Sequence, residues 1–202
     1  MNRGSELSKR GRKTKTPLTK PKPSSKTPTT LFAALVIIAV LVGAYVLSQP
    51  TKPPANPGDI APDFELPVVT AEGLTDQVVR LSTFRGKVVL LEFMVSWCHV
   101  CQEMAPSIHY LYGKYRGQDA VFLSVAGTQS GATADSTAAF IQQYDAKWTH
   151  VLDSDNSVFS RYAVEATPTY FVLDRSGKIL GRFEGVVITD ALSSVIDDAL
   201  SS

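Results

Sequence analysis

The chain has 202 residues, enough for one folded domain and an additional segment, and its formal net charge of +1 is close to neutral. The charge is unevenly distributed, because residues 1–30 hold nine Lys and Arg against one Glu, a net charge of +8, and the remainder carries −7. With two cysteines and three histidines in all, the composition excludes a disulfide-rich scaffold and a four-cysteine zinc site.

The first 28 residues are basic, rich in Pro, Ser and Thr, and almost without apolar side chains. Such a segment cannot bury enough surface to offset its conformational entropy, so we predict a disordered tail over 1–28. A basic tail can indicate a nucleic-acid partner, but the segment that follows favours a membrane topology signal and no nucleic acid.

The second segment has no charged residue from position 27 to position 51 and contains the run "LFAALVIIAVLVGAYVL". These seventeen residues span about 25 Å as a helix, and with their uncharged flanks they predict a transmembrane helix over 29–49, in contact with membrane lipid. The run exceeds the length of a signal-peptide core, which favours an uncleaved signal anchor over a cleaved peptide. The basic tail then lies in the cytoplasm, in a single-pass protein of the cell membrane whose remaining residues are extracytoplasmic.

Residues 50–58, "PTKPPANPG", hold four prolines and predict a stiff, extended linker. The folded domain is expected over 59–202. Its predicted strands lie at 78–81, 88–95, 120–126, 148–153, 169–174 and 178–185, and its predicted helices follow Cys98 and cover 136–145 (with Ser136 as N-cap), 158–162 and 189–200. Strands and helices that alternate in this way predict an α/β fold with a mixed central sheet flanked by helices.

Both cysteines lie in "SWCHVC", where a buried strand gives way to a helix. Cys98 at a helix N-terminus favours the thiolate, because cysteine pKa values at such sites fall from about 8.5 to between about 3.5 and 7.5. Cys101, one turn later, can close a disulfide with it. A structural disulfide across three residues constrains little chain, so a redox pair is favoured, and two unrelated buried thiols are the remaining alternative.

Several further motifs accompany the cysteines: "APDFELP" at 61–67, "LSTFRGKVVLLEF" at 81–93, "ATPTYFVLD" at 166–174 and "DRSGKILGRFEG" at 174–185. Together with "WCHVC", they resemble the membrane-anchored TlpA/ResA-like thiol–disulfide oxidoreductases of the thioredoxin superfamily. The resemblance covers 59–202 and implies a thioredoxin-like fold and exchange of a dithiol and a disulfide with partner proteins.

The resemblance also implies residue roles. Cys98 would attack a substrate disulfide and Cys101 would resolve the mixed disulfide. Trp97 would form part of the apolar surface around the sulfurs, Pro168 would be a cis proline facing them, and the backbone of Thr167 would pair with a substrate peptide.

The chain departs from this family pattern at two places. Val100 replaces the proline that many members carry before the second cysteine, and both Val100 and His99 are expected to tune the redox equilibrium, His99 by stabilising a thiolate when it is protonated. Met104 stands where ResA-like proteins often have Glu. Glu92, inside the apolar strand, offers a substitute: we predict a buried carboxyl of raised pKa that exchanges the proton of Cys101.

The expected function is therefore a membrane-tethered oxidoreductase without a cofactor or metal, contributing to cell redox homeostasis. The resemblance favours a reductant that acts in cytochrome c maturation or general disulfide reduction and exchanges electrons with a membrane donor or acceptor. Two alternatives use the same cysteines. A peroxiredoxin-like peroxidase would need a PxxxTxxC pattern that "LLEFMVSW" lacks, and a copper(I)-delivery protein would need a further ligand such as His150.

Overall fold

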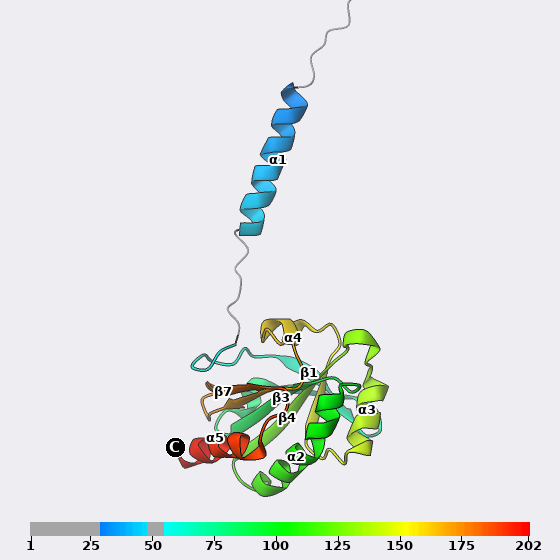
Figure 1. Ribbon diagram of the computed structural model, residues 1–202, viewed down its shortest axis with the longest axis vertical. Coiled ribbons are helices and arrows are strands. Elements are labelled where there is room, and N and C mark those ends of the chain that lie inside the picture. Colours follow the sequence, from blue (N-terminus) through cyan, green and yellow to red (C-terminus); the bar gives the residue numbers. More distant parts are fainter. Residues whose placement is uncertain (1–28, 48–54) are drawn as a thin grey trace, which may run out of the picture. The chain divides into compact units, whose positions relative to one another are not determined.

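The computed structural model describes residues 29–47 and 55–202 (Figure 1). Contacts between Cα atoms divide the chain into two units, Met1–Thr51 and Lys52–Ser202. The tail predicted over 1–28 and most of the predicted linker lie outside the described residues.

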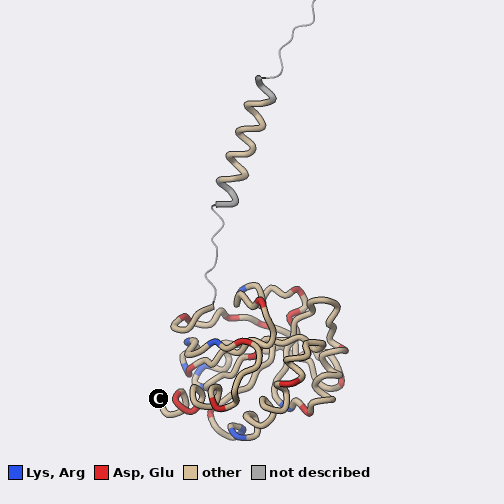
Figure 2. Tube along the Cα trace, viewed as in Figure 1, with Lys and Arg blue, Asp and Glu red and all other residues tan. Residues whose placement is uncertain are grey.

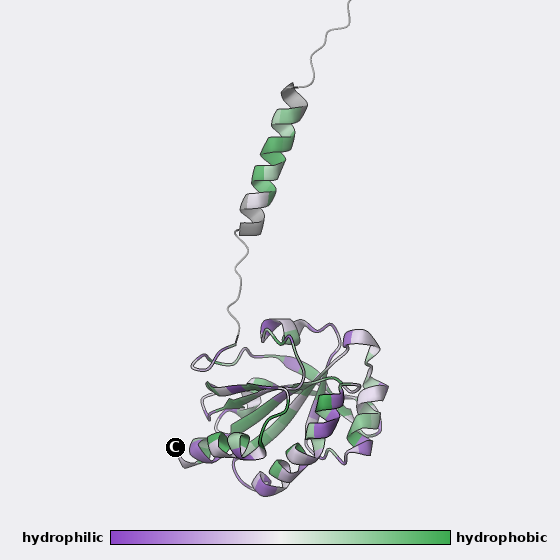
Figure 3. Ribbon diagram, viewed as in Figure 1, coloured by the Kyte–Doolittle hydropathy of each residue, from purple (hydrophilic) through white to green (hydrophobic). Residues whose placement is uncertain are grey.

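The first unit contains helix α1 (Thr29–Leu47), which has no charged residue and is hydrophobic over most of its coloured length (Figure 3). Of the residues that the structure describes, none forms a helix that meets both the length and the apolarity needed to cross a membrane. The transmembrane segment predicted for 29–49 stays a prediction.

The second unit is built on a seven-stranded sheet in the order β2-β1-β5-β4-β3-β6-β7. Strands β3, β4 and β5 are parallel to one another, and the other neighbouring strands pair antiparallel, which confirms the predicted mixed sheet. The strands are β1 (Glu65–Thr70), β2 (Gly73–Arg80), β3 (Val88–Met94), β4 (Ala120–Gly127), β5 (Thr149–Asp153), β6 (Thr169–Leu173) and β7 (Ile179–Glu184).

Helices cover both faces of this sheet. The short helix α4 lies on the opposite side from α2 and α5 (Figure 1), and acidic and basic residues are interspersed over the unit (Figure 2). The helices are α2 (His99–Tyr115), α3 (Ala134–Gln143), α4 (Ser157–Arg161) and α5 (Thr189–Ser201), with 3-10 turns at Leu81–Phe84 and Gln129–Gly131.

Strand β3 is interior to the sheet and all seven of its residues are buried. Its aliphatic, β-branched sequence suits a strand that is covered on both faces. Phe93 packs edge-on against Phe171 of β6, with ring centroids 5.7 Å apart, on the face opposite to Glu92. This rigid strand ends four residues before Cys98 and so fixes the start of α2.

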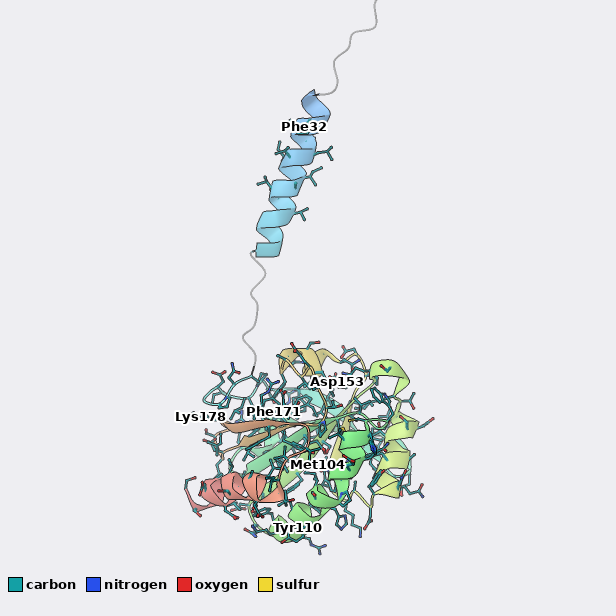
Figure 4. The ribbon with its side chains drawn as sticks, viewed as in Figure 1. Phe32, Met104, Tyr110, Asp153, Phe171 and Lys178 are labelled. Carbon is teal, nitrogen blue, oxygen red and sulfur yellow. The ribbon has the colours of Figure 1, made fainter. Side chains whose placement is uncertain are left out.

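Helix α2 buries the apolar stripe that the sequence predicts. Met104, Ile108, Leu111 and Tyr115 are all buried, and Figure 4 shows Met104 on the part of α2 that overlies the sheet. Spacings of four, three and four residues bring these side chains to one helical face. Together, β3 and α2 hold the cysteines at the carboxyl end of a central strand.

Two details of the prediction were wrong. The sequence predicts only a short strand at 78–81, where the structure has the hairpin of β1 and β2. The hairpin is hard to predict because β2 is a largely exposed edge strand and β1 contains Pro67 beside an irregular register. The N-cap of α3 is Thr133 rather than Ser136. Thr133 accepts from the Ser136 amide, and Ser136 accepts from the Thr133 amide, so the two form a capping box.

Candidate active site

Cys98 is the N-cap residue of α2, and its Sγ accepts a hydrogen bond from the backbone N–H of Cys101 at 3.3 Å. The amide and the positive end of the helix dipole both favour negative charge on this sulfur. Both cysteines are free thiols; Cys98 is 6 % exposed and Cys101 is fully buried. Cys98 is therefore the less buried of the two thiols, while Cys101 is sheltered one turn further along the helix.

The segment before β6 lies against Cys98. The Thr167–Pro168 peptide bond is cis, and the Cys98 thiol donates to the Thr167 carbonyl oxygen at 3.3 Å. Pro168 is buried, whereas Thr167 is half-buried. The structure thus brings Cys98, Thr167 and Pro168 together, with the isomer that the family resemblance implies.

Three exposed apolar side chains, which we call the apolar rim, lie on segments next to this junction: Trp97, Val186 and Ile188. Trp97 is 54 % exposed, and its Nε1 donates to the Gln129 carbonyl at 3.0 Å, which holds the indole beside Cys98. The loop after β7 is tied to the cis proline, because the Gly185 amide donates to the Pro168 carbonyl at 2.8 Å. This loop presents Val186 and Ile188, which are 71 % and 76 % exposed.

Val186 and Ile188 were missed by the sequence analysis. The available signal was an uncharged apolar run, "VVI", between a strand and a helix. Such a run is also typical of buried packing, and only the fold shows that two of its three side chains face solvent.

Glu92 lies in the interior, beneath the cysteines. It is 5 % exposed, and burial raises its pKa to about 7, against smaller opposing effects of the Ser124 hydroxyl and then the Tyr170 hydroxyl. Ser124 on β4 and Tyr170 on β6 are its partners in the strand register. The Ser124 hydroxyl donates to Glu92 Oε2, and the buried Tyr170 hydroxyl has no hydrogen-bond partner among the described residues.

Cys101 is coupled to this carboxyl. Burial, first, and then the hydrogen bond with Cys98 and the negative charge of Glu92 raise the pKa of the Cys101 thiol well above its ordinary value. A thiol of this kind reacts only when a nearby base takes its proton. Glu92 titrates near neutral pH, and it is the carboxyl whose charge acts on the Cys101 thiol, so it is the candidate base for this proton.

The two predicted tuning residues occupy different environments. The His99 side chain is 83 % exposed, and its Nε2 lies 3.6 Å from Glu103 Oε1, one helical turn away. Val100 is half-buried and packs against the core. The structure therefore pairs His99 with a carboxylate on its own helix, and its effect on the redox equilibrium stays a prediction.

His150 lies on β5, where it is paired in register with Ser124 of the adjacent strand β4. Its Nδ1 is 2.9 Å from the Trp148 carbonyl, and burial lowers its pKa to about 4, so the ring is neutral. Within residues 29–47 and 55–202, no group of three or more His, Cys, Asp and Glu side chains is placed to hold a metal ion.

Comparison with known proteins assigns the chain to a family. The model of the AhpC/TSA family matches residues 57–182, which is more than half of the chain. The chain belongs to the AhpC/TSA family. The match includes both cysteines, Glu92 and Pro168.

Relatives of this AhpC/TSA protein carry names that agree with its site. The thiol–disulfide oxidoreductase ResA of Oceanobacillus iheyensis is 29 % identical over 167 residues, which cover 81 % of this chain and 84 % of ResA. The ResA of Bacillus thuringiensis subsp. konkukian is 28 % identical over 160 residues, which cover 77 % of this chain and 88 % of that protein.

Solved structures agree with the fold. A crystal structure from Chlorobium tepidum, of a protein proposed to be the thiol:disulfide interchange protein DsbE, superposes with a TM-score of 0.62 and 32 % identity, over 72 % of this chain and 98 % of that one. This AhpC/TSA protein therefore has a thioredoxin-like α/β fold. Its predicted membership of the thioredoxin-like thiol–disulfide oxidoreductases is confirmed.

Proposed function

We propose that this protein exchanges electrons with disulfide bonds of partner proteins, as a membrane-anchored, extracytoplasmic reductant. One observation carries the proposal. Cys98 stands at a helix N-terminus with its sulfur against the Thr167 carbonyl, and Cys101 is buried behind it, within the electrostatic influence of Glu92.

In the proposed cycle, the Cys98 thiolate attacks one sulfur of a partner disulfide. The partner's S–S bond breaks, a Cys98–partner disulfide forms, and one partner sulfur leaves as a thiolate. Cys101 then gives its proton to Glu92 and attacks Cys98 Sγ, which releases the second partner thiolate. Two electrons pass to the partner, whose two thiolates take up protons from Glu92 and from water, and Cys98 and Cys101 are left as a disulfide.

The surface around Cys98 supports a protein substrate. Thr167 is half-buried and its carbonyl lies beside the attacking sulfur, where an extended peptide can pair with its backbone. The apolar rim offers three large side chains to such a segment, and exposed apolar side chains grouped around a reactive atom are typical of protein-binding surfaces.

The sequence supports the proposed location. The uncharged segment at 29–49 is long enough to span a membrane, and the net charge of +8 in the first 30 residues favours a cytoplasmic tail. The redox domain would then lie outside the cytoplasm, where no glutathione-like pool reduces it. We therefore propose a dithiol or quinol-type membrane donor that returns Cys98 and Cys101 to thiols, and the relatives named thiol–disulfide oxidoreductase support the exchange reaction itself.

Electron transfer to a protein disulfide tests this proposal. Reduced full-length protein in detergent, mixed with a small protein that contains one disulfide, should reduce about one disulfide per chain. Mass analysis after alkylation should find the Cys98–Cys101 disulfide in the product. The proposal fails if both cysteines remain free while the partner stays oxidised. In that case, Cu(I) titration and peroxide consumption would test the two alternative functions.

Removal of the apolar rim should weaken the encounter with a protein substrate. The double variant Trp97→Ala and Ile188→Ser should raise KM for a disulfide-bonded protein about tenfold, because exposed aromatic and aliphatic anchors dominate such interfaces. The reaction with a small disulfide should keep its rate. Tyr110→Ser is the matched control, since Tyr110 is 65 % exposed and lies on α2 away from Met104 (Figure 4). Equal losses with both substrates would contradict a docking role.

A further inference from the structure

A chain of buried hydrogen bonds leads from β5 to the acid beneath the cysteines. Trp148, just before β5, donates its Nε1–H to Ser124 Oγ on β4 at 2.7 Å. Ser124 in turn donates its hydroxyl to Glu92 Oε2 on β3. Ser124 is fully buried and Trp148 is 7 % exposed, so water does not compete for these bonds.

The direction of this chain follows from the donors available. An indole nitrogen can only donate, so Trp148 occupies one lone pair of the Ser124 oxygen. Ser124 has a single hydroxyl proton, and Glu92 Oε2 is the one acceptor that the described residues offer it. If Glu92 instead donated to Ser124 through Oε2, the Ser124 proton would be left without a partner, which is costly in a buried site.

We propose that Ser124 and Trp148 are positioning residues, which hold Glu92 Oε2 as a hydrogen-bond acceptor so that the proton exchanged with Cys101 is carried on Oε1. This inference rests on the proposed role of Glu92 in resolution. In that step, the Cys101 S–H bond breaks, its proton moves to Oε1, and its electron pair forms the bond to Cys98 Sγ. The Cys98–partner S–S bond breaks at the same time, and the partner sulfur leaves as a thiolate.

Trp148 is itself held in place by packing. Its ring lies 6.0 Å from the Tyr112 ring of α2 and 5.2 Å from the His150 ring, centroid to centroid. The His150 ring nitrogen 2.9 Å from the Trp148 carbonyl adds a polar restraint on the backbone. The indole therefore has little freedom to turn away from Ser124.

The other titratable groups that face Glu92 are few. Cys98 and Cys101 lie at the start of α2, and Tyr170 is the register partner of Glu92 on β6. His150 is on β5, one strand further away than Ser124 of β4. Burial raises the pKa values of Cys101 and Tyr170 and lowers that of His150 to about 4, which keeps these three groups neutral near pH 7. The ¹³C signal of the Glu92 carboxyl, assigned with Glu92→Gln, reports the titration of that carboxyl directly.

The test compares the pH midpoint of Glu92 and the pH profile of resolution in reduced full-length protein. Ser124→Ala should move both midpoints upward by about one pH unit, because a carboxylate that loses a buried donor is less stable relative to its acid. Trp148→Phe keeps the aromatic packing but frees the Ser124 hydroxyl, and it should shift both midpoints in the same direction. Ser124→Thr keeps the hydroxyl and should restore the parent values.

Thr137→Val is the control, since it removes another buried hydroxyl, on α3, that does not contact Glu92. Parent midpoints in both Ser124→Ala and Trp148→Phe would overturn the inference. If Glu92→Gln also leaves resolution unchanged, the proposed role of Glu92 fails. If Glu92→Gln slows resolution but the two variants keep the parent midpoints, the role of Glu92 stands and the positioning chain alone is refuted.

Discussion

Replacing Cys101 with Ala should turn a transient intermediate into a stable product. Cys98 of this variant can still attack a partner disulfide, but no second thiol is left to displace the partner. The covalent complex should therefore accumulate to about one partner per chain and resist alkylation. Non-reducing electrophoresis and intact mass measure it directly. Because Cys98 is only 6 % exposed, other thiols should reach the mixed disulfide slowly.

Cys98→Ala should give the opposite result in the same assay. The remaining thiol, Cys101, is fully buried and its pKa is raised by that burial, so no covalent complex should form near neutral pH. The assignment of roles would be reversed if Cys98→Ala trapped the partner and Cys101→Ala did not.

Glu92→Gln should slow resolution of the mixed disulfide about 100-fold at pH 8, because a neutral amide cannot take the Cys101 proton and general-base catalysis contributes at least this much. Formation of the mixed disulfide by Cys98 should keep its rate. Stopped-flow measurement with an excess of partner separates the two steps. Glu103→Gln, which alters an exposed carboxylate on α2, is the matched control. An equal rate of resolution in the parent and in Glu92→Gln would remove Glu92 from the mechanism.

The same carboxyl should make the stability of the reduced domain depend on pH. The folded protein holds the Glu92 proton up to pH about 7, whereas the unfolded chain releases it near the ordinary value of 4.5. This contribution to stability is fully present below pH 4.5 and is lost as the pH rises through 7. The loss amounts to about 3 kcal/mol. Urea unfolding of the parent and Glu92→Gln between pH 5 and 8 should show the variant gaining relative stability as the pH rises.

The sequence predicted the elements whose burial pattern is unambiguous. Strand β3 is an uninterrupted aliphatic run, and α2 repeats its apolar residues with helical spacing, so both were located to within one or two residues. The hairpin of β1 and β2 was not predicted, because an exposed edge strand needs no alternation of apolar and polar residues and its pairing is set by contacts distant in sequence.

The residues of the candidate site also fall into those that the sequence can predict and those that it cannot. Cys98, Cys101 and Glu92 could be recognised locally, since a thiol pair at a strand–helix junction and a carboxyl inside an apolar strand each violate an ordinary preference of the sequence. Val186, Ile188, Ser124 and Trp148 could not, because nothing near them in the sequence is unusual. Their relevance comes from strand register and from a loop that the fold carries back to Pro168.

The reduction potential of the full-length protein is the most direct measurement of the central claim. Equilibration in dithiothreitol buffers, read by alkylation of Cys98 and Cys101, should give a two-electron couple near thioredoxin's value of about −270 mV, as a reductant requires. A couple near about −120 mV would contradict the reducing role and indicate disulfide donation. If no reversible two-electron couple linked the two cysteines, thiol–disulfide exchange at this site would be refuted.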